Sequence, residues 1–502
     1  MAKYRCPMCG WVYDEEAEGA PIASLEACPM CGAPGADFYL IEEDASESFG
    51  AVPSLTQEDA TALEGAAGAT TESSRSGAAA DSGAAAARET SARNPLATPD
   101  RLRRRDPGVR HMDTIHRLAE NGRLPDGAMA TTLPLPKWED VLVLGAQLDP
   151  MPLAEDAEVD ITCTIGPDAA RPLVLAGPAF VSHMSFGALS REAKIALATG
   201  AAAAGTATCS GEGGILPEEL AAAGNRYIFE FAPLRYSVTD ENLRAAAAVE
   251  IKIGQGTKPG MGGHLPGEKV TDEIARIRGR KPGEDIISPS TIPGVTSVRD
   301  LKPLVEELRE RSEGAPIGIK LAAGHIERDV IAAATAGADF ITIDGRGGAT
   351  GASPVMLRDA ASVPTLYALV RARRCLDKIG SSASLVITGG LRMASDIVKA
   401  LALGADAVAL ATASLMALGC QQYRICGTGR CPMGIATQDP ELRARLDVEV
   451  GARRVENFYR ATFDDLRMFC RVMGHESICD LSPDDLVTCD PAIAERCGIA
   501  RA

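Results

Sequence analysis

A repeated pattern of strands and helices is the feature that most constrains the fold. Between residues 174 and 412, a short apolar strand, a polar or glycine-rich loop and an Ala- and Leu-rich helix follow one another repeatedly. Eight such units over about 240 residues are typical of a (β/α)8 barrel, the TIM barrel. A doubly wound sheet is the alternative, but no candidate strand is followed by a G-x-G-x-x-G loop. We therefore predict an α/β barrel with strands at 180–183, 206–209, 249–253, 286–288, 317–321, 340–343, 385–388 and 407–411.

The overall charge and hydropathy narrow the classes of function. The 502 residues carry a formal net charge of −17, which argues against a general nucleic-acid binder. The sequence contains no apolar run of about 18 residues, so we predict no membrane span. Its first residues lead into a cysteine motif rather than a signal peptide, which favours a cytoplasmic protein. In that compartment, grouped cysteines indicate metal or cluster ligation rather than disulfides.

Residues 1–44 carry two C-P-x-C-G motifs. Two such motifs let four thiolates surround one metal ion tetrahedrally. The flanking "WVYD" resembles rubredoxin, although the 18 residues between the motifs form a shorter loop and no Trp precedes the second pair. We expect a rubredoxin-like domain with iron, and a structural zinc ribbon is the alternative because the same ligands suit both metals. The predicted ligands are Cys6, Cys9, Cys28 and Cys31.

The rest of the chain divides by composition. Residues 45–96 are rich in Ala, Gly, Ser and Thr without apolar periodicity, and we predict a flexible linker there. Residues 97–173 form an N-terminal flank to the barrel, which we place at 174–435. Residues 436–502 are predicted to form a C-terminal helical extension.

Glycine-rich loops follow the sixth and seventh predicted strands, and Ala411 and Thr412 follow the eighth. Barrels that bind a phosphate group usually do so after strands seven and eight, through backbone N–H groups. A single glycine pair would be an ordinary turn, but several at matching strand ends indicate a phosphate-bearing cofactor. The residues concerned are Gly347, Gly348 and Thr350 after the sixth strand, Gly389 and Gly390 after the seventh, and Ala411 and Thr412 after the eighth.

Three lysines and one glutamate lie where a barrel would have its mouth. Lys252 and Lys320 lie within apolar strands, which is costly unless each contacts an anion or an electron-rich ring. A flavin meets both conditions, whereas lysines that point outward are the alternative. Lys258 follows in the loop "GQGTKPGMGG", and Glu212 in "CSGEGG" is a candidate proton carrier.

Three cysteines, Cys420, Cys426 and Cys431, are spaced C-x5-C-x4-C among glycines in "CQQYRICGTGRCPMG". Zinc sites and complete four-iron clusters usually take four protein ligands, and the sequence offers no fourth cysteine nearby. Three buried free thiols would explain such regular spacing poorly.

These stretches together resemble the FMN-binding synthase domain of glutamate synthases, in the stand-alone archaeal-type form. The resemblance covers roughly residues 100–490 and rests on "MSFGALS", "CSGEGG", "EIKIGQGTKPGMGGHLPGEKV", "GRGGATGASP", "LGCQQYRICGTGRCPMGIATQDPELR" and "RRVENFYRATFDDLRMF". It implies a 3Fe–4S cluster on the three cysteines. It also implies FMN held by Met184, Ser185, Ser210, Lys252, Lys320 and the glycine loops.

The same resemblance implies the substrate and its contacts. Lys258 and Arg278 would bind the carboxylates of 2-oxoglutarate, with His264 beside them, and Glu212 and Lys258 would surround the 2-iminoglutarate formed with ammonia. Large bacterial members have an acidic residue and a glutamine where this chain has Met261 and His264. Reduced FMN would then give a hydride to the imine carbon.

We expect a glutamate synthase-type oxidoreductase that receives electrons through rubredoxin-like iron and the cluster. Neither a glutaminase domain nor a pyridine-nucleotide domain is evident. The expected partners are therefore a separate glutaminase subunit, or free ammonia, and a ferredoxin or NAD(P)H reductase as donor. One alternative is the FMN-domain subunit of a methylamine–glutamate N-methyltransferase, which has no need of external electrons. A non-catalytic electron-relay subunit is a third possibility.

Overall fold

The computed structural model describes residues 2–6, 12–28, 35, 38–41, 96, 102, 106, 111–122, 126–348, 350–351 and 353–502. The chain forms two compact units, and the larger includes everything from Pro125 onward. Cys9, Cys31 and residues 45–95 of the predicted linker lie outside the described residues. No helix among the described residues is long and apolar enough to cross a membrane.

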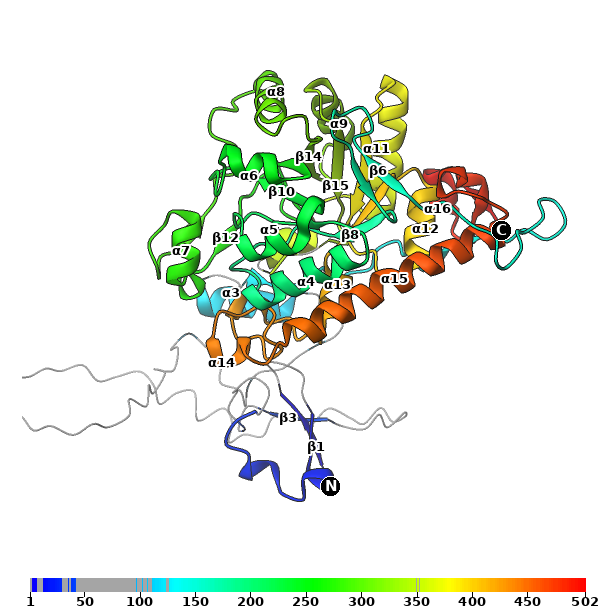
Figure 1. Ribbon diagram of the computed structural model, residues 1–502. Helices are drawn as coiled ribbons and strands as arrows, with labels where there is room; N and C mark the ends of the chain where they lie inside the picture. Colours follow the sequence, from blue (N-terminus) through cyan, green and yellow to red (C-terminus); the bar gives the residue numbers. More distant parts are fainter. Residues whose placement is uncertain are drawn as a thin grey trace, which may run out of the picture. The chain divides into compact units, whose positions relative to one another are not determined.

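The smaller unit contains a three-stranded antiparallel sheet in the order β2-β1-β3, of which β1 and β3 are labelled in Figure 1. Its strands are β1 (Lys3–Arg5), β2 (Val12–Asp14) and β3 (Tyr39–Ile41), and its helices are α1 (Glu15–Glu18) and α3 (Met112–Asn121). Cys6 directly follows β1 in the chain; Cys6 and Cys28 are both buried and are grouped with the larger unit. Because two of the four predicted ligands are not described, the rubredoxin-like metal site stays a prediction.

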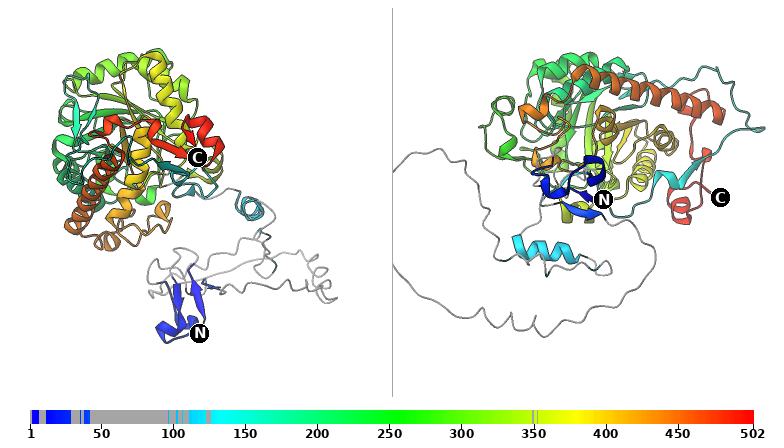
Figure 2. Two further views of the ribbon diagram at one scale, coloured as in Figure 1. Left: turned by 90° about the vertical axis from the view of Figure 1, so that its right-hand side faces the viewer. Right: turned by 90° about the horizontal axis from the view of Figure 1, so that it is seen from below.

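The larger unit is built on a closed barrel of eight parallel strands, which confirms the predicted (β/α)8 fold (Figures 1 and 2). Every strand pairs in parallel with both of its neighbours. In chain order the strands are β8 (Ala179–Val181), β9 (Thr208–Cys209), β10 (Tyr227–Phe231), β11 (Ala248–Lys252), β14 (Ile317–Ala322), β15 (Phe340–Asp344), β17 (Ser384–Thr388) and β18 (Ala407–Leu410).

One predicted barrel strand is wrong and another was missed. Ile286–Ile287 form β13, which pairs antiparallel with β12 (His264–Leu265) in a segment inserted between β11 and β14. Ile287 is 69% exposed, so this apolar pair does not enter the barrel core. The true third barrel strand is β10, in which all five residues are buried even though Glu230 interrupts its apolar run.

Helices surround the barrel on its outside (Figure 2). The first of them, α4 (Arg191–Ala203), is capped at its N-terminus by Ser190, whose side chain accepts a hydrogen bond from the amide of Ala193. Gly200 allows α4 to lie close against α15 (Val448–Met473), because a Cβ at that position would come within 2.4 Å of the Ala452 carbonyl oxygen. The helices after successive strands are α4 (Arg191–Ala203), α5 (Pro217–Ala223), α6 (Asp240–Ala245), α8 (Leu301–Arg311), α9 (Ile326–Thr335), α11 (Thr365–Ile379), α12 (Ala394–Ala402) and α13 (Thr412–Leu418).

A β-hairpin covers the N-terminal ends of the barrel strands. It consists of β6 (Cys163–Ile165) and β7 (Leu173–Leu175), paired antiparallel. Its buried side chains share one apolar cluster with barrel residues at or near the starts of strands, among them Phe180, Ala207 and Phe340. This end of the barrel is therefore filled, as in other barrels whose interiors are packed cores.

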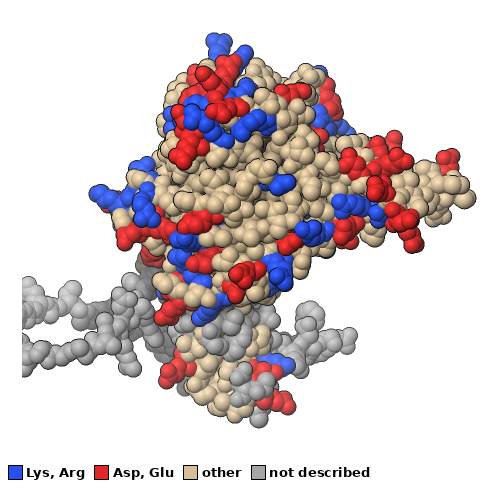
Figure 3. Space-filling model, in the orientation of Figure 1, with Lys and Arg blue, Asp and Glu red and all other residues tan. Residues whose placement is uncertain are grey.

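The remaining elements flank the barrel. The long helix α15 (Val448–Met473) packs against α4, α12 and α13. On the face shown in Figure 3, acidic and basic side chains are interspersed. The other bounds are β4 (Asp126–Gly127), β5 (Val141–Val143), α7 (Asp272–Arg278), β16 (Ser353–Pro354), α10 (Val355–Ala360), α14 (Pro440–Arg443), β19 (Leu486–Thr488), α16 (Pro491–Cys497) and β20 (Ala500–Arg501).

Candidate active site

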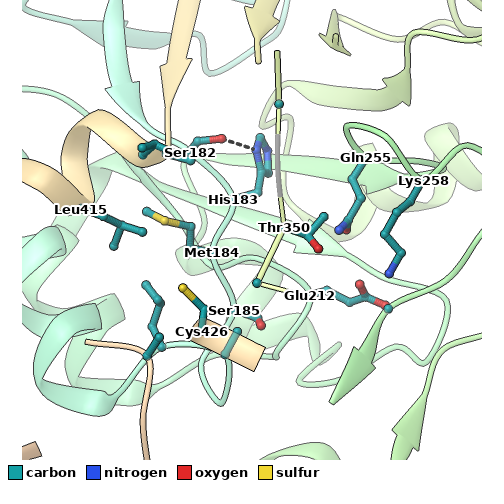
Figure 4. Close-up of a pocket in the computed structure, with 18 of the residues that line it drawn as sticks. Ser182, His183, Met184, Ser185, Glu212, Gln255, Lys258, Thr350, Leu415 and Cys426 are labelled. Carbon is teal, nitrogen blue, oxygen red and sulfur yellow. Dashed lines mark hydrogen bonds between the residues drawn. The ribbon is translucent and has the colours of Figure 1, made fainter. Parts of the chain in front are cut away.

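A large cavity opens at the C-terminal ends of the barrel strands, opposite the hairpin. The cavity and the open solvent at its mouth together take up about 1650 Å³ that no protein atom fills. The loops after β8, β11, β15, β17 and β18 line it, together with the inserted segment and the cysteine loop (Figure 4). Active sites of (β/α)8 enzymes lie at this end of the barrel.

The structure brings almost all the predicted barrel residues to this one cavity. The exception is Ser210, which is fully buried. Its hydroxyl accepts from the amide of Glu230 at 2.8 Å and donates to the Gly211 carbonyl at 3.0 Å, so it braces two strands. The residues that line the cavity are Met184, Ser185, Glu212, Lys252, Lys258, His264, Arg278, Lys320, Gly347, Gly348, Thr350, Gly389, Gly390, Ala411, Thr412, Cys420, Cys426 and Cys431.

The glycine loops after β15 and β17 meet backbone to backbone. A Cβ on Gly347 would lie 2.3 Å from the Gly389 carbonyl oxygen, and Gly390 has a φ of +97°. Side chains at these positions would force the two loops apart. The cavity wall here is therefore peptide backbone, which suits contact with a phosphate group.

Glu212 and Lys252 form an ion pair inside the cavity. Burial would raise the pKa of Glu212, but the charge of Lys252 and hydrogen bonds from Lys252 and Ser288 hold that pKa below its usual value. Lys252 also lies 3.9 Å from Glu230. Glu212 is therefore ionised at neutral pH and held in place by a buried cation.

The inserted segment brings further cations to the same space. Lys258 and Gln255, from the loop after β11, point toward the part of the cavity that holds Glu212 (Figure 4). Arg278, at the end of α7, donates to the Phe186 carbonyl at 2.6 Å and lies over the Tyr236 ring. Both Lys258 and Arg278 are buried. Buried cations at a cavity wall favour an anionic ligand.

His264 and Met261 differ in their relation to the cavity. His264 lines it, and its Nε2 lies 2.9 Å from a carboxylate oxygen of Asp285. The other oxygen of Asp285 accepts from the amide of Gly267 at 2.7 Å, so this carboxylate orients both the ring and its loop. Met261 is 42% exposed and does not line the cavity.

The three cysteines of the C-x5-C-x4-C motif lie together at one side of the cavity. They also line a small adjoining pocket. Burial raises the pKa of the Cys426 thiol to about 11, and the neighbouring Cys420 and Cys431 contribute to the rise. Gln422 directs its amide N–H and its side-chain NH2 toward the Cys420 sulfur at 3.5 and 3.3 Å. Three converging thiols with N–H donors nearby fit an iron–sulfur cluster.

Several buried charged residues around the cavity were missed in the sequence. His183 pairs with Glu250 and lies 4.0 Å from Glu230, while Lys320 lies 3.9 Å from Asp344. Glu230 and Glu250 interrupt apolar strands, and Asp344 ends one. These charged residues in apolar strands were the signal that the sequence offered.

Lys194, on α4, was also missed. Its ammonium forms an ion pair with Glu219 at 2.7 Å and donates to the carbonyls of Met184, Cys209 and Ser210. Those carbonyls belong to the loops that carry Ser185 and Glu212. Lys194 therefore links, from behind the cavity, the backbones of the two segments that carry Ser185 and Glu212.

Comparison with known proteins identifies the family. The protein-family model described as a conserved region in glutamate synthase matches residues 110–476 of this chain. The archaeal-type glutamate synthase (NADPH) of Thermotoga sp. strain RQ2 is 38% identical over 73% of this chain and 77% of its own. The archaeal glutamate synthase (NADPH) of Methanocaldococcus jannaschii is 43% identical over 61% of each chain.

Among solved structures, a mutant of an active chimera of (S)-mandelate dehydrogenase aligns with 70% of this chain and 88% of its own. The TM-score is 0.47 and the sequence identity is 17%. The family match, by contrast, spans the barrel, the inserted segment and the cysteine loop. The chain therefore belongs to the glutamate synthase family and is an oxidoreductase.

Proposed function

We propose that this protein converts 2-oxoglutarate and ammonia to L-glutamate by reductive amination. The observation that carries the proposal is the meeting of three features in one cavity: buried cations for a dicarboxylate, glycine loops for a phosphate, and three thiols for a cluster. Ammonia adds to the keto carbon and water leaves, which gives 2-iminoglutarate. Two electrons and the necessary protons then complete the amine.

FMN fits the cavity. The backbone walls at Gly347 and Gly389 suit its phosphate, and Lys252 and Lys320 provide positive charge beside a flavin ring. When bound, FMN supplies the hydride that reduces the imine carbon. Met184, Ser185, Thr350, Gly390, Ala411 and Thr412 are proposed as its further contacts.

Side chains of the chain itself bind the substrate and move protons. Lys258 and Arg278 are proposed to hold the two carboxylates, with His264 at the edge of the same wall. Glu212, kept ionised by Lys252, accepts a proton from the adding ammonia. Lys258 stabilises the negative charge that develops on the keto oxygen during the addition.

Electrons are proposed to enter through the cysteine side of the cavity. A 3Fe–4S cluster on Cys420, Cys426 and Cys431 would pass single electrons to the flavin site. The N-terminal motif, with iron on Cys6, Cys9, Cys28 and Cys31, is proposed to feed that cluster. The external donor is proposed to be a ferredoxin or an NAD(P)H reductase, and ammonia to come from a glutaminase subunit or from solution.

The test uses the full chain, purified anaerobically, loaded with flavin and iron, and reduced chemically. After addition of 2-oxoglutarate and ¹⁵N-ammonium, mass spectrometry should find labelled glutamate. Lys258→Met should lower the rate about 100-fold without loss of flavin. Lys281→Met removes the same charge from an exposed position of the same segment and should leave the rate unchanged.

The proposal fails if the reduced, flavin- and cluster-loaded protein yields no labelled glutamate. Exchange of the amine between glutamate and methylamine under the same conditions, without net reduction, would identify a transferase instead. Adding NADPH or reduced ferredoxin in place of the chemical reductant then identifies the donor class.

A further inference from the structure

Lys269 ties the inserted segment to the cysteine loop. It is the last residue of the 3-10 helix Gly267–Lys269, it lines the cavity, and only 6% of its surface is exposed. Its ammonium donates to the Cys426 carbonyl at 3.2 Å and to the Ala188 carbonyl at 3.4 Å. It therefore contacts the loop after β8 as well as the backbone of a proposed cluster ligand.

The charge of Lys269 is compensated differently from that of other buried lysines. Lys194 pairs with Glu219, and Lys252 pairs with Glu212. In the part of the chain that the structure describes, Lys269 forms no ion pair with a carboxylate within 4.0 Å. Burial, and to a smaller extent Arg278, lowers the pKa of Lys269, and the sulfurs of Cys426 and Cys431 are the groups that oppose this shift. A buried cation needs an anionic partner, and these cysteines would provide it once they ligate iron as thiolates.

This arrangement has a consequence for electron transfer. Cysteines ligate iron as thiolates, so a cluster held by three of them is an anionic centre. Reduction adds one more negative charge. A nearby positive charge that cannot move away stabilises the reduced cluster more than the oxidised one, and burial strengthens the effect because water screens it less.

We propose that Lys269 is a positioning residue that raises the reduction potential of the cluster held by Cys420, Cys426 and Cys431. The inference rests on the proposed function, because it requires that the three cysteines hold a cluster. It assigns Lys269 to the cluster and not to the substrate, although Lys258 and Arg278 belong to the same inserted segment. The neighbouring lysine thus sets how readily the cluster accepts an electron.

The test compares three variants by redox titration, with the EPR signal of the oxidised cluster as the readout. Lys269→Met removes the charge, Lys269→Gln keeps a hydrogen-bond donor without the charge, and Lys269→Arg keeps both. The Met and Gln variants should lower the equilibrium constant for one-electron reduction at least tenfold, or about 59 mV. The Arg variant and the control Lys281→Met should stay within about threefold of the wild type.

The outcomes separate this inference from the proposed function. Met and Gln variants with intact clusters and wild-type potentials would overturn the role of Lys269 and leave the cluster itself established. Loss of the cluster from both, with retention in the Arg variant, would also overturn it, since Lys269 would then hold the site together. A wild-type protein that binds no cluster after anaerobic reconstitution would refute both the cluster and the inference.

Discussion

Replacing Lys194 by methionine should destabilise the larger unit strongly, although the residue lies behind the cavity wall. Lys194 is 2% exposed and Glu219 is fully buried, so the substitution leaves a carboxylate in the protein interior without its cation. Breaking a buried ion pair by removing one partner costs about 3–5 kcal/mol. The hydrogen bonds to the Met184, Cys209 and Ser210 carbonyls are lost with it.

The pH dependence follows from the carboxyl group. Burial raises the pKa of Glu219 from 4.5 to about 7 even though Lys194 opposes the rise. The folded state thus binds the proton of the Glu219 carboxyl more tightly than the unfolded state does. The stabilisation of the folded state by this proton is therefore lost as the pH rises from 4.5 to 7. Without Lys194 the pKa rises further. The cost of Lys194→Met should therefore be smaller at about pH 5.5 than at about pH 8.5.

A double-mutant cycle with Glu219→Gln measures the pair directly. Urea unfolding of Lys194→Met, Glu219→Gln and the double variant, followed by circular dichroism, gives the coupling free energy. We expect the two changes to be strongly non-additive, with the double variant more stable than Lys194→Met alone at about pH 8.5. Additivity within about 0.5 kcal/mol, or a cost for Lys194→Met below about 1 kcal/mol, would refute the reasoning.

Three further predictions concern the cavity. Gly347→Ala should weaken FMN binding and lower stability by about 1–3 kcal/mol, because its Cβ would meet the Gly389 carbonyl; flavin titration and urea unfolding measure both effects. Cys426→Ser should keep FMN but lose cluster absorbance and donor-dependent turnover, and full iron content in that variant would contradict the ligand assignment. Lys252→Met should raise the pKa of Glu212, so the acid limb of the pH–rate profile should move to higher pH; an unmoved limb would exclude Glu212 as the titrating base.

The barrel could be predicted because the unit of strand, loop and helix is repeated along the chain. Seven of the eight candidate strands correspond to barrel strands. The error at Ile286–Ile287 arose because a two-residue hairpin strand has the same local composition as a short barrel strand. The missed strand, Tyr227–Phe231, contains Glu230, and its buried environment depends on contacts with partners far away in the sequence.

The site was predictable where it uses glycines and cysteines, whose spacing is itself a signal. The glycine loops at Gly347 and Gly389 and the three cysteines all reach one cavity. The roles of Lys194 and Lys269 could not be predicted from the sequence. A single lysine on a helix or in a loop is expected to be exposed to solvent, and only the folded structure shows which groups surround it.

Because the hairpin of β6 and β7 closes the other end of the barrel, the cavity is a pocket that opens at one end only. With the far end of the barrel filled by the apolar cluster, small molecules have to enter and leave on the same side. Product must therefore depart before the next substrate arrives. Under the proposed function, electrons would not use this opening, because a cluster on the three cysteines would pass them through the cavity wall while the cavity is occupied. The path of electrons would then be separate from the path of small molecules, and the proposed cluster could be reduced while substrate or product still occupies the cavity.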